Sequence, residues 1–280
     1  MDIVFNQHPN GTFDIEYFQY TPSKEAGLAF MVIFAGAGLA HIGYMFFFRA
    51  WSFIPMILGG ICEVFGYYGR FKAHFEPDQI GPWIMQAMLL LCAPPLLAGS
   101  IYMSLGRLIT ALDASRFSLI RPSILTKIYV LIDVLAFISQ LAGVGVQASG
   151  SPDLMATGKK LVLAGLIFQE VALLFFTYVA VRTQQKLSRE PTDVSLGIGH
   201  VLRWRRYFAA MYVATLLLMV RNMLRLIEFA QGPKGTIASN EPFIYVFDAL
   251  PMALVMAAPL VFYPARLTRV AWNSEYKVVK

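Results

Sequence analysis

The chain has 280 residues, of which 57% are hydrophobic and only 14% carry a charge, and its mean hydropathy is +0.58. Soluble domains carry about 25% charged residues, so this composition excludes a soluble globular protein and indicates a membrane protein. The formal net charge is +6, and most of it comes from basic residues at the ends of apolar runs. That distribution is typical of membrane topology, and we expect no nucleic-acid partner.

Seven apolar runs in the sequence come close to the length of about 20 residues that a membrane-spanning helix needs. They are Ala26–Phe48, Phe53–Arg70, Ile80–Leu108, Ile124–Gln147, Lys160–Val181, Tyr207–Ala230 and Phe243–Tyr263. The loops between them are too short for a second domain. We therefore predict an all-α membrane protein with an extracellular tail over 1–25, a seven-transmembrane-helix bundle over 26–268 and a cytoplasmic tail over 269–280.

The orientation follows from the basic residues near the span ends. With the amino terminus outside, fourteen Lys and Arg residues lie on the cytoplasmic side and six on the outer side, and basic residues favour the cytoplasmic side. The first 20 residues are polar and acidic, so we expect no cleavable signal peptide and a first span that inserts as its own signal. The glycosylation sequon Asn10-Gly-Thr12 agrees with an outer amino terminus.

The first two spans contain a helix start and a charged face. Ser23 is suited to cap the first helix. His41 is the only histidine within a span, and we favour a hydrogen-bonded packing role for it over a ligand or proton-relay role. In span two, Glu63, Tyr67 and Arg70 recur at i, i+4 and i+7, so these side chains share one face of the helix.

Polar residues continue through the next three spans. They are Tyr102 in span three, Asp133, Gln140 and Gln147 in span four, and Gln169 and Glu170 in span five. The residues of span four are seven apart and form a single stripe, and interhelical hydrogen bonding is the simplest explanation of the glutamines. Span three also contains Pro94-Pro95, which we expect to bend the helix and which is compatible with a hinge.

Charges are most concentrated in the last two spans. Span six contains Arg221, Arg225 and Glu228 at i, i+4 and i+7. A charge near the centre of a membrane helix costs about 2.5 to 3.5 kcal/mol, so we expect all three to turn away from lipid together. Span seven repeats the same spacing with Glu241, Tyr245 and Asp248.

The depth of these residues predicts a shared site. At about 1.5 Å of rise per residue, Glu63, the span-six charges and Asp248 fall in the outer half of the membrane, with Asp133 and Glu170 near its centre. Five embedded acids face two embedded arginines. An inert network of ion pairs is the alternative, although buried pairs repay their desolvation poorly. We expect one charged chamber that opens towards the outer leaflet and accepts a cationic amphipathic lipid.

The ordered motifs together resemble one family, the fungal lipid-translocating exporters, also described as seven-transmembrane aminocholesterol and sphingoid long-chain-base resistance proteins. The matching motifs are Tyr20-x-Pro22-Ser23, Glu63-x-x-Gly66-Tyr67-x-x-Arg70, Ala-Pro-Pro-Leu-Leu-Ala98…Tyr102…Gly106-Arg107, Asp133…Gln140-x-x-Gly143, Gly165-x-x-x-Gln169, Arg221-x-x-x-Arg225-x-x-Glu228 and Glu241-x-x-x-Tyr245-x-x-Asp248. The resemblance implies a multi-pass protein of the plasma membrane or another endomembrane. It also implies export of sphingoid bases and resistance to sterol-like amines, with porphyrin or haem traffic in one branch.

Other functions remain as alternatives. A seven-helix lipid or stress sensor is the main one, because a receptor has the same architecture; the Gly106-Arg107 motif after span three lacks a G-protein-coupled receptor signature. We expect that the chain is not an enzyme. Seven-helix membrane hydrolases hold zinc through several embedded histidines, and here only His41 lies within a predicted span. The cysteines Cys62 and Cys92 lie within spans, which favours free thiols. We expect no metal, cofactor or nucleotide-binding loop, and membrane lipids as partners.

Overall fold

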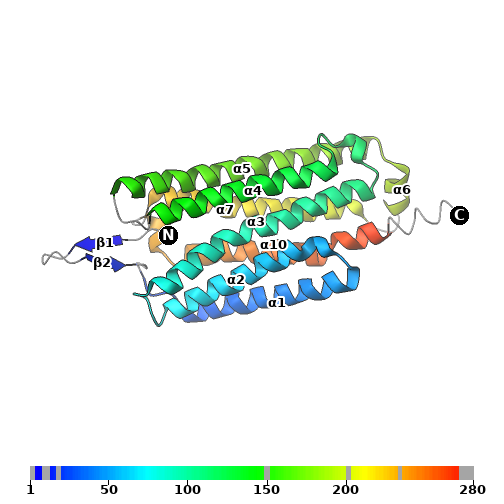
Figure 1. The fold of residues 1–280 in the computed structure, drawn as a ribbon. Helices are drawn as coiled ribbons and strands as arrows, with labels where there is room; N and C mark the ends of the chain where they lie inside the picture. Colours follow the sequence, from blue (N-terminus) through cyan, green and yellow to red (C-terminus); the bar gives the residue numbers. More distant parts are fainter. Residues whose placement is uncertain are drawn as a thin grey trace.

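The computed structural model describes residues 4–7, 13–16, 20–147, 152–199, 203–232 and 235–270. Long helices run back and forth along one common axis (Figure 1). Their bounds are Lys24–Phe48 (α1), Ile54–Ala73 (α2), Ile80–Ala111 (α3), Pro122–Gln147 (α4), Pro152–Arg189 (α5), Trp204–Gln231 (α7) and Leu250–Val261 (α10). Each connection reverses the chain direction, so the fold is an up-and-down helical bundle.

Short elements join or extend these helices. They are the strands Val4–Gln7 (β1) and Phe13–Glu16 (β2), the 3₁₀ turns Trp51–Phe53 and Ser115–Phe117, the helices Asp193–Gly199 (α6), Thr236–Ser239 (α8) and Pro242–Ile244 (α9), and the π-helical turn Tyr245–Ala249. Residues 264–270 are helical again. The two strands form an antiparallel hairpin with Val4 opposite Glu16, an element that the sequence did not predict. The Asn10 sequon, and residues 271–280 of the predicted cytoplasmic tail, lie outside the described residues.

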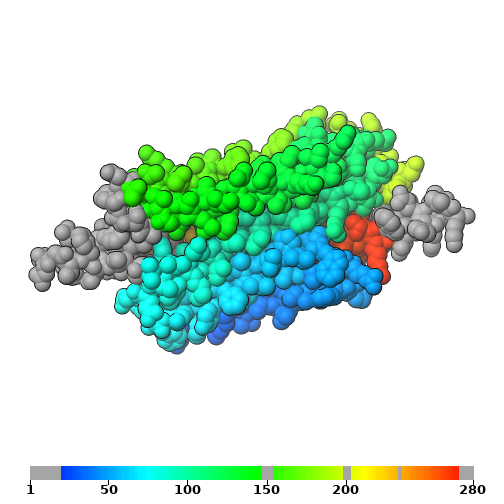
Figure 2. All heavy atoms as spheres, in the orientation of Figure 1, coloured from blue at the N-terminus to red at the C-terminus, as the bar shows by residue number. Residues whose placement is uncertain are grey.

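Contacts between the long helices close a ring, and α3 makes further contacts across its interior. Each helix from α1 to α5 contacts the next, α5 contacts α7, α7 contacts α10, and α10 contacts α1. Helix α3 also contacts α5, α7 and α10 across the ring. Burial follows this arrangement, since 56% of the most apolar stretch of α3 is buried against 17% of that of α1. The space-filling view shows the helices packed side by side along one elongated body (Figure 2).

Within the described residues, six helical segments are long and apolar enough to cross a membrane, which makes the chain a multi-pass membrane protein. They are Lys24–Phe48, Ile80–Ala111, Pro122–Val146, Leu154–Arg189, Trp204–Gln231 and Pro242–Val270. Helix α2 is not among them, although we predicted a span there. It has 20 residues and contains Glu63 and Arg70, and both side chains are buried in the bundle. Its outward face instead exposes Leu58, Ile61 and Phe65.

Local sequence signals account for several of the helix limits. Ser23 caps α1 as predicted, and its hydroxyl oxygen accepts a hydrogen bond of 3.3 Å from the Ala26 amide. Helix α3 remains one continuous helix through Pro94 and Pro95. Helix α5 is longer at both ends than the predicted span Lys160–Val181, because a helix does not have to end where its apolar run ends. Cys62 and Cys92 are free, as predicted.

Candidate functional site

The deepest polar contacts join α7 to the π-helical turn. Asp248 accepts from the Nε of Arg221 at 2.6 Å and also from the Nη2 of Arg225. Arg225 donates from its Nη1 to Glu228 at 3.0 Å, and Arg221 donates from its Nη2 to the Leu90 carbonyl of α3 at 2.7 Å. We call Arg221, Arg225, Glu228 and Asp248 the deep cluster. All four side chains are buried, so the predicted inward turn of the span-six charges is confirmed.

Local backbone geometry places the acid between the two arginines. The i, i+4 and i+7 spacing aligns the α7 charges on one face. Asp248 comes from the helical segment opposite, within the five-residue π turn Tyr245–Ala249. A π turn shifts the register of the residues that follow it, and such turns occur frequently at functional sites.

Glu63 and Tyr67 of α2 complete the surroundings of the deep cluster. Glu63 is 2% exposed and Tyr67 is fully buried, and both lie within electrostatic range of Asp248 and Arg225. Among the described residues Glu63 makes no hydrogen bond or ion pair, and the Tyr67 hydroxyl has no hydrogen-bond partner there. A carboxyl group thus lies beside two arginines that already bind other acids.

A second set of contacts closes the end of the bundle nearest the hairpin. Arg70 donates to the hydroxyls of Tyr245 and Tyr20, each at 2.8 Å, and to Glu241 at 2.9 Å. Glu241 also accepts from the Tyr245 hydroxyl at 2.9 Å and from the Ser23 amide at 2.7 Å. We call Tyr20, Arg70, Glu241 and Tyr245 the rim cluster. Arg70 is 1% exposed, so the rim cluster ties the segment before α1 firmly to α2 and to the start of the last span.

Polar groups also lead from the deep cluster across the bundle. Asn222 is next to Arg221 and lies within reach of the Glu170 carboxyl group. Glu170 and Asp133 are both within electrostatic range of the Tyr102 hydroxyl. Neither carboxylate oxygen of Asp133 has a hydrogen-bond partner of good geometry among the described residues. These residues extend the polar contacts from α7 through α5 and α3 to α4.

The two predicted glutamines bind each other. Gln140 of α4 donates from its Nε2 to the Oε1 of Gln169 of α5 at 3.2 Å, and both are buried. Gly165 allows this approach, because a Cβ there would lie 2.9 Å from the Gln140 Cγ. The contact agrees with the prediction of hydrogen bonding between helices.

Comparisons with known proteins identify the family of this chain. Residues 56–271 match the family described as RTA1 like protein. This chain belongs to that family. It is 31% identical over 274 residues to Protein RTA1 of Saccharomyces cerevisiae, which covers 89% of this chain and 85% of that protein.

Two further yeast relatives have names that describe transport. Protoporphyrin uptake protein 1 is 36% identical over 210 residues, or 74% of this chain and 67% of that protein. The sphingoid long-chain base transporter RSB1 is 26% identical over 281 residues, or 89% of this chain and 73% of that protein. Both come from Saccharomyces cerevisiae. No solved structure matches the chain.

In this RTA1-like chain the predicted charges gather, but the predicted open chamber is not present around the described residues of the deep cluster. The cavity beside Arg221 and Arg225 measures about 20 Å³, which is room for about one water molecule. Beside these two arginines the expected open chamber is not found in this conformation, and elsewhere along the charged residues it stays a prediction. The physical reason is that guanidinium and carboxylate groups in a dry interior bind one another directly when no ligand separates them.

Several groups that contact the deep cluster or the rim cluster were not predicted from the sequence. Tyr20 was part of a family motif but not of the predicted site, and the Leu90 carbonyl could not be predicted from side-chain chemistry. Asn222 follows Arg221 directly in span six, which was the available signal for it. The His74 ring bonds the Pro22 carbonyl at 2.8 Å and adds a second contact between α2 and the segment before α1.

Proposed function

We propose that this chain moves an amphipathic lipid with a cationic headgroup across a membrane. Membership of the RTA1-like family supports transport of a lipid-like substrate, and a sphingoid long-chain base transporter is among the relatives. A sphingoid base has an amine headgroup, which suits a carboxylate site. We further propose seven passes with the amino terminus outside, residence in the plasma membrane, and no enzymatic activity.

The observation that carries the proposal is the unpaired carboxyl group of Glu63. Burying a carboxylate without a partner costs several kcal/mol, so an inert framework has no need of it. An ammonium group that enters beside Glu63 would supply the missing partner. It would also compete with Arg221 and Arg225 for Asp248, which lies within electrostatic range of Glu63.

The rim cluster supports the interpretation that this conformation is one state of a transport cycle, the state that is closed towards the outer leaflet. Arg70 is held by three side chains and is almost completely buried. For a lipid headgroup to pass between the deep cluster and the outer leaflet, the bonds of Arg70 to Tyr20 and Glu241 must separate. Alternating access of this kind needs only the relative movement of neighbouring helices.

Flux measured on purified full-length protein in liposomes tests the proposal. We expect the protein to move a labelled long-chain amine faster than its hydroxyl-terminated analogue. Glu63→Gln, which keeps the shape and removes the charge, should lower amine flux about tenfold or more, since hydrogen bonds to charged groups are worth about 1.5–3 kcal/mol.

The matched control is Glu76→Gln. Glu76 is more exposed and forms an i,i+4 ion pair with Lys72 at 3.2 Å, so its loss should leave flux unchanged. Equal flux of the amine and its hydroxyl analogue would contradict the cationic substrate. Resistance conferred in cells by a protein that moves neither compound in liposomes would instead support the sensor alternative.

A porphyrin is the second candidate substrate. The specific observation is the 36% identity to a protoporphyrin uptake protein. A porphyrin carries carboxylates, and these would bind Arg221 or Arg225 in place of Asp248. Labelled protoporphyrin in the same liposomes distinguishes the two, because Arg225→Gln should then reduce porphyrin flux more than Glu63→Gln does.

A further inference from the structure

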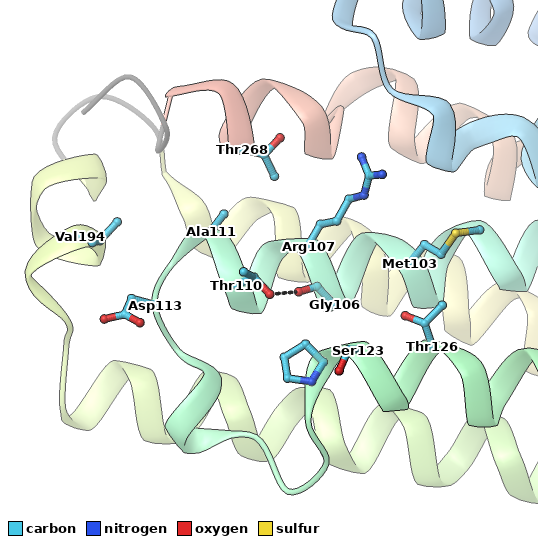
Figure 3. Close-up of a pocket in the computed structure, with 11 residues that line it drawn as sticks. Met103, Gly106, Arg107, Thr110, Ala111, Asp113, Ser123, Thr126, Val194 and Thr268 are labelled. Carbon is cyan, nitrogen blue, oxygen red and sulfur yellow. Dashed lines mark hydrogen bonds between the residues drawn. The ribbon is translucent and has the colours of Figure 1, made fainter. Parts of the chain in front are cut away.

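A cleft lies at the end of the bundle opposite the rim cluster, between α3, the start of α4, α6 and the helical segment 264–270. It encloses about 700 Å³, within the range of about 300–1,000 Å³ that is usual for small-molecule sites. Figure 3 shows Arg107 of α3 extending towards the segment that carries Thr268, whereas Ser123 and Thr126 of α4 lie on the other side of α3. Neither the deep cluster nor the proposed translocation step uses these residues.

Arg107 is the principal free donor of this cleft. It makes no hydrogen bond or ion pair with any described residue, whereas two of the surrounding threonine hydroxyls are engaged. Thr110 donates to the Gly106 carbonyl at 2.9 Å, and Thr268 donates to the Ala265 carbonyl at 3.0 Å. The Ser123 hydroxyl makes no such bond among the described residues. The Arg107 guanidinium group is therefore free to bind a ligand on the side of the cleft that faces Thr268.

A further unsatisfied group lies nearby. The Tyr263 hydroxyl is buried and has no hydrogen-bond partner among the described residues, and it is within electrostatic range of Arg107. Among the described residues that line the cleft, Asp113 is the one acid, and in Figure 3 it lies on the loop after α3, near Val194 and away from the Arg107 side chain. The chemistry around Arg107 therefore favours an anion.

The depth of Arg107 indicates which anion. Helix α3 has 32 residues, or about 48 Å at 1.5 Å per residue, and a bilayer with its headgroups is about 40–45 Å thick. Arg107 lies four residues before the end of α3 at Ala111, about 6 Å along the axis. This position corresponds to the headgroup layer, where lipid phosphates lie.

We propose that the cleft around Arg107 is a binding site for the phosphate group of a membrane lipid in the leaflet at this end of the bundle. The guanidinium group binds the phosphate in a bidentate manner, as arginine commonly does. Met103, Ala111 and Val194 supply apolar wall for the adjoining glycerol and upper acyl carbons. The site is separate from the proposed translocation pathway, and its test involves no flux.

The test is a titration of purified full-length protein in neutral detergent with dioctanoyl phosphatidate, followed by thermophoresis. Dioctanoylglycerol has the same tails without the phosphate, and inorganic phosphate has no tails. We expect wild type to bind the phosphatidate about tenfold or more tightly than the glycerol analogue, and inorganic phosphate not to displace it at equal concentration.

Two variants of Arg107 test whether phosphatidate binding depends on this site or only on the positive charge of the protein. Arg107→Gln should weaken phosphatidate binding about tenfold or more, and Arg107→Lys should fall in between, because lysine keeps the charge but not the fork. The control Arg182→Gln removes an exposed arginine of α5, bonded to Tyr178 at 2.8 Å, and should change binding less than about twofold. A thermal melt of each variant confirms that it is folded.

Three results would overturn the proposal. The first is equal affinity of wild type and folded Arg107→Gln, and the second is an equal loss with Arg182→Gln, which would make the effect one of general charge. The third is displacement of the phosphatidate by inorganic phosphate at equal concentration, which would indicate a soluble anion instead of a lipid.

Discussion

Replacement of Asp248 by asparagine tests whether the deep cluster holds the bundle together as one unit. Asp248 accepts a hydrogen bond from Arg221 through one carboxylate oxygen and from Arg225 through the other. Its side chain is 4% exposed, and those of the arginines are 2% and 6% exposed. Asp248→Asn removes the charge shared by both arginines, and only one amide oxygen remains to accept.

The expected loss follows from these contacts. Removing one partner of a buried ion pair costs about 3–5 kcal/mol, because the remaining charge is left uncompensated. Glu228 still binds Arg225, and the asparagine oxygen still accepts from one arginine. We therefore expect a loss of about 3 kcal/mol in the free energy of unfolding, at the low end of that range.

Unfolding of the purified protein in mixed detergent micelles measures this loss. Asp248→Asn combined with Arg221→Gln should be more stable than the sum of the single losses predicts, because Arg221 pairs with Asp248 and the double variant also removes the charge left unpaired. The control is Glu76→Gln in the exposed pair with Lys72, which should change stability by about 0.5 kcal/mol or less. A loss below about 1 kcal/mol for Asp248→Asn, or strict additivity of the double variant, would refute the reasoning.

Two further predictions concern the contact between α4 and α5. Gly143→Ala should lower the free energy of unfolding by about 1–3 kcal/mol, because its Cβ would lie 2.6 Å from the Gly158 carbonyl oxygen. The control is Gly145→Ala, which should be neutral in the same unfolding assay, because a Cβ at Gly145 meets nothing within 4 Å. Gln140→Leu should cost about 1–3 kcal/mol, because it leaves the Gln169 amide oxygen buried without a donor. Gln140→Leu with Gln169→Leu should recover most of that loss, and a double variant less stable than either single variant would contradict this.

Much of the fold could be predicted because the signals are local. The start of α1 at Ser23 follows from one hydroxyl group in the first turn. The predicted span Ile80–Leu108 lies within α3, which begins at Ile80 and ends at Ala111, since the apolar run extends over most of its length. Helix α2 shows the limit of this approach, because the hydropathy criterion excludes it although it packs within the bundle as predicted.

The sequence predicted which residues form the candidate site, but it did not predict how those residues bind one another. The spacing of Arg221, Arg225 and Glu228 placed them on one face, and their burial is confirmed. The spacing could not indicate that Asp248 would lie between both arginines and leave Glu63 without a partner. The tight packing beside Arg221 and Arg225 also had no sequence signal.

The sequence by itself determined the class of protein, the approximate limits of most helices and the inward direction of the charges, because each depends on the cost of placing a residue in lipid. Only the tertiary structure decided which charges meet. The pairing depends on the π-helical turn Tyr245–Ala249, on the attachment of Tyr20 to Arg70 across 50 residues of chain and on the contacts that α3 makes across the ring. These are long-range contacts, and no periodicity within a single helix encodes the partner on another.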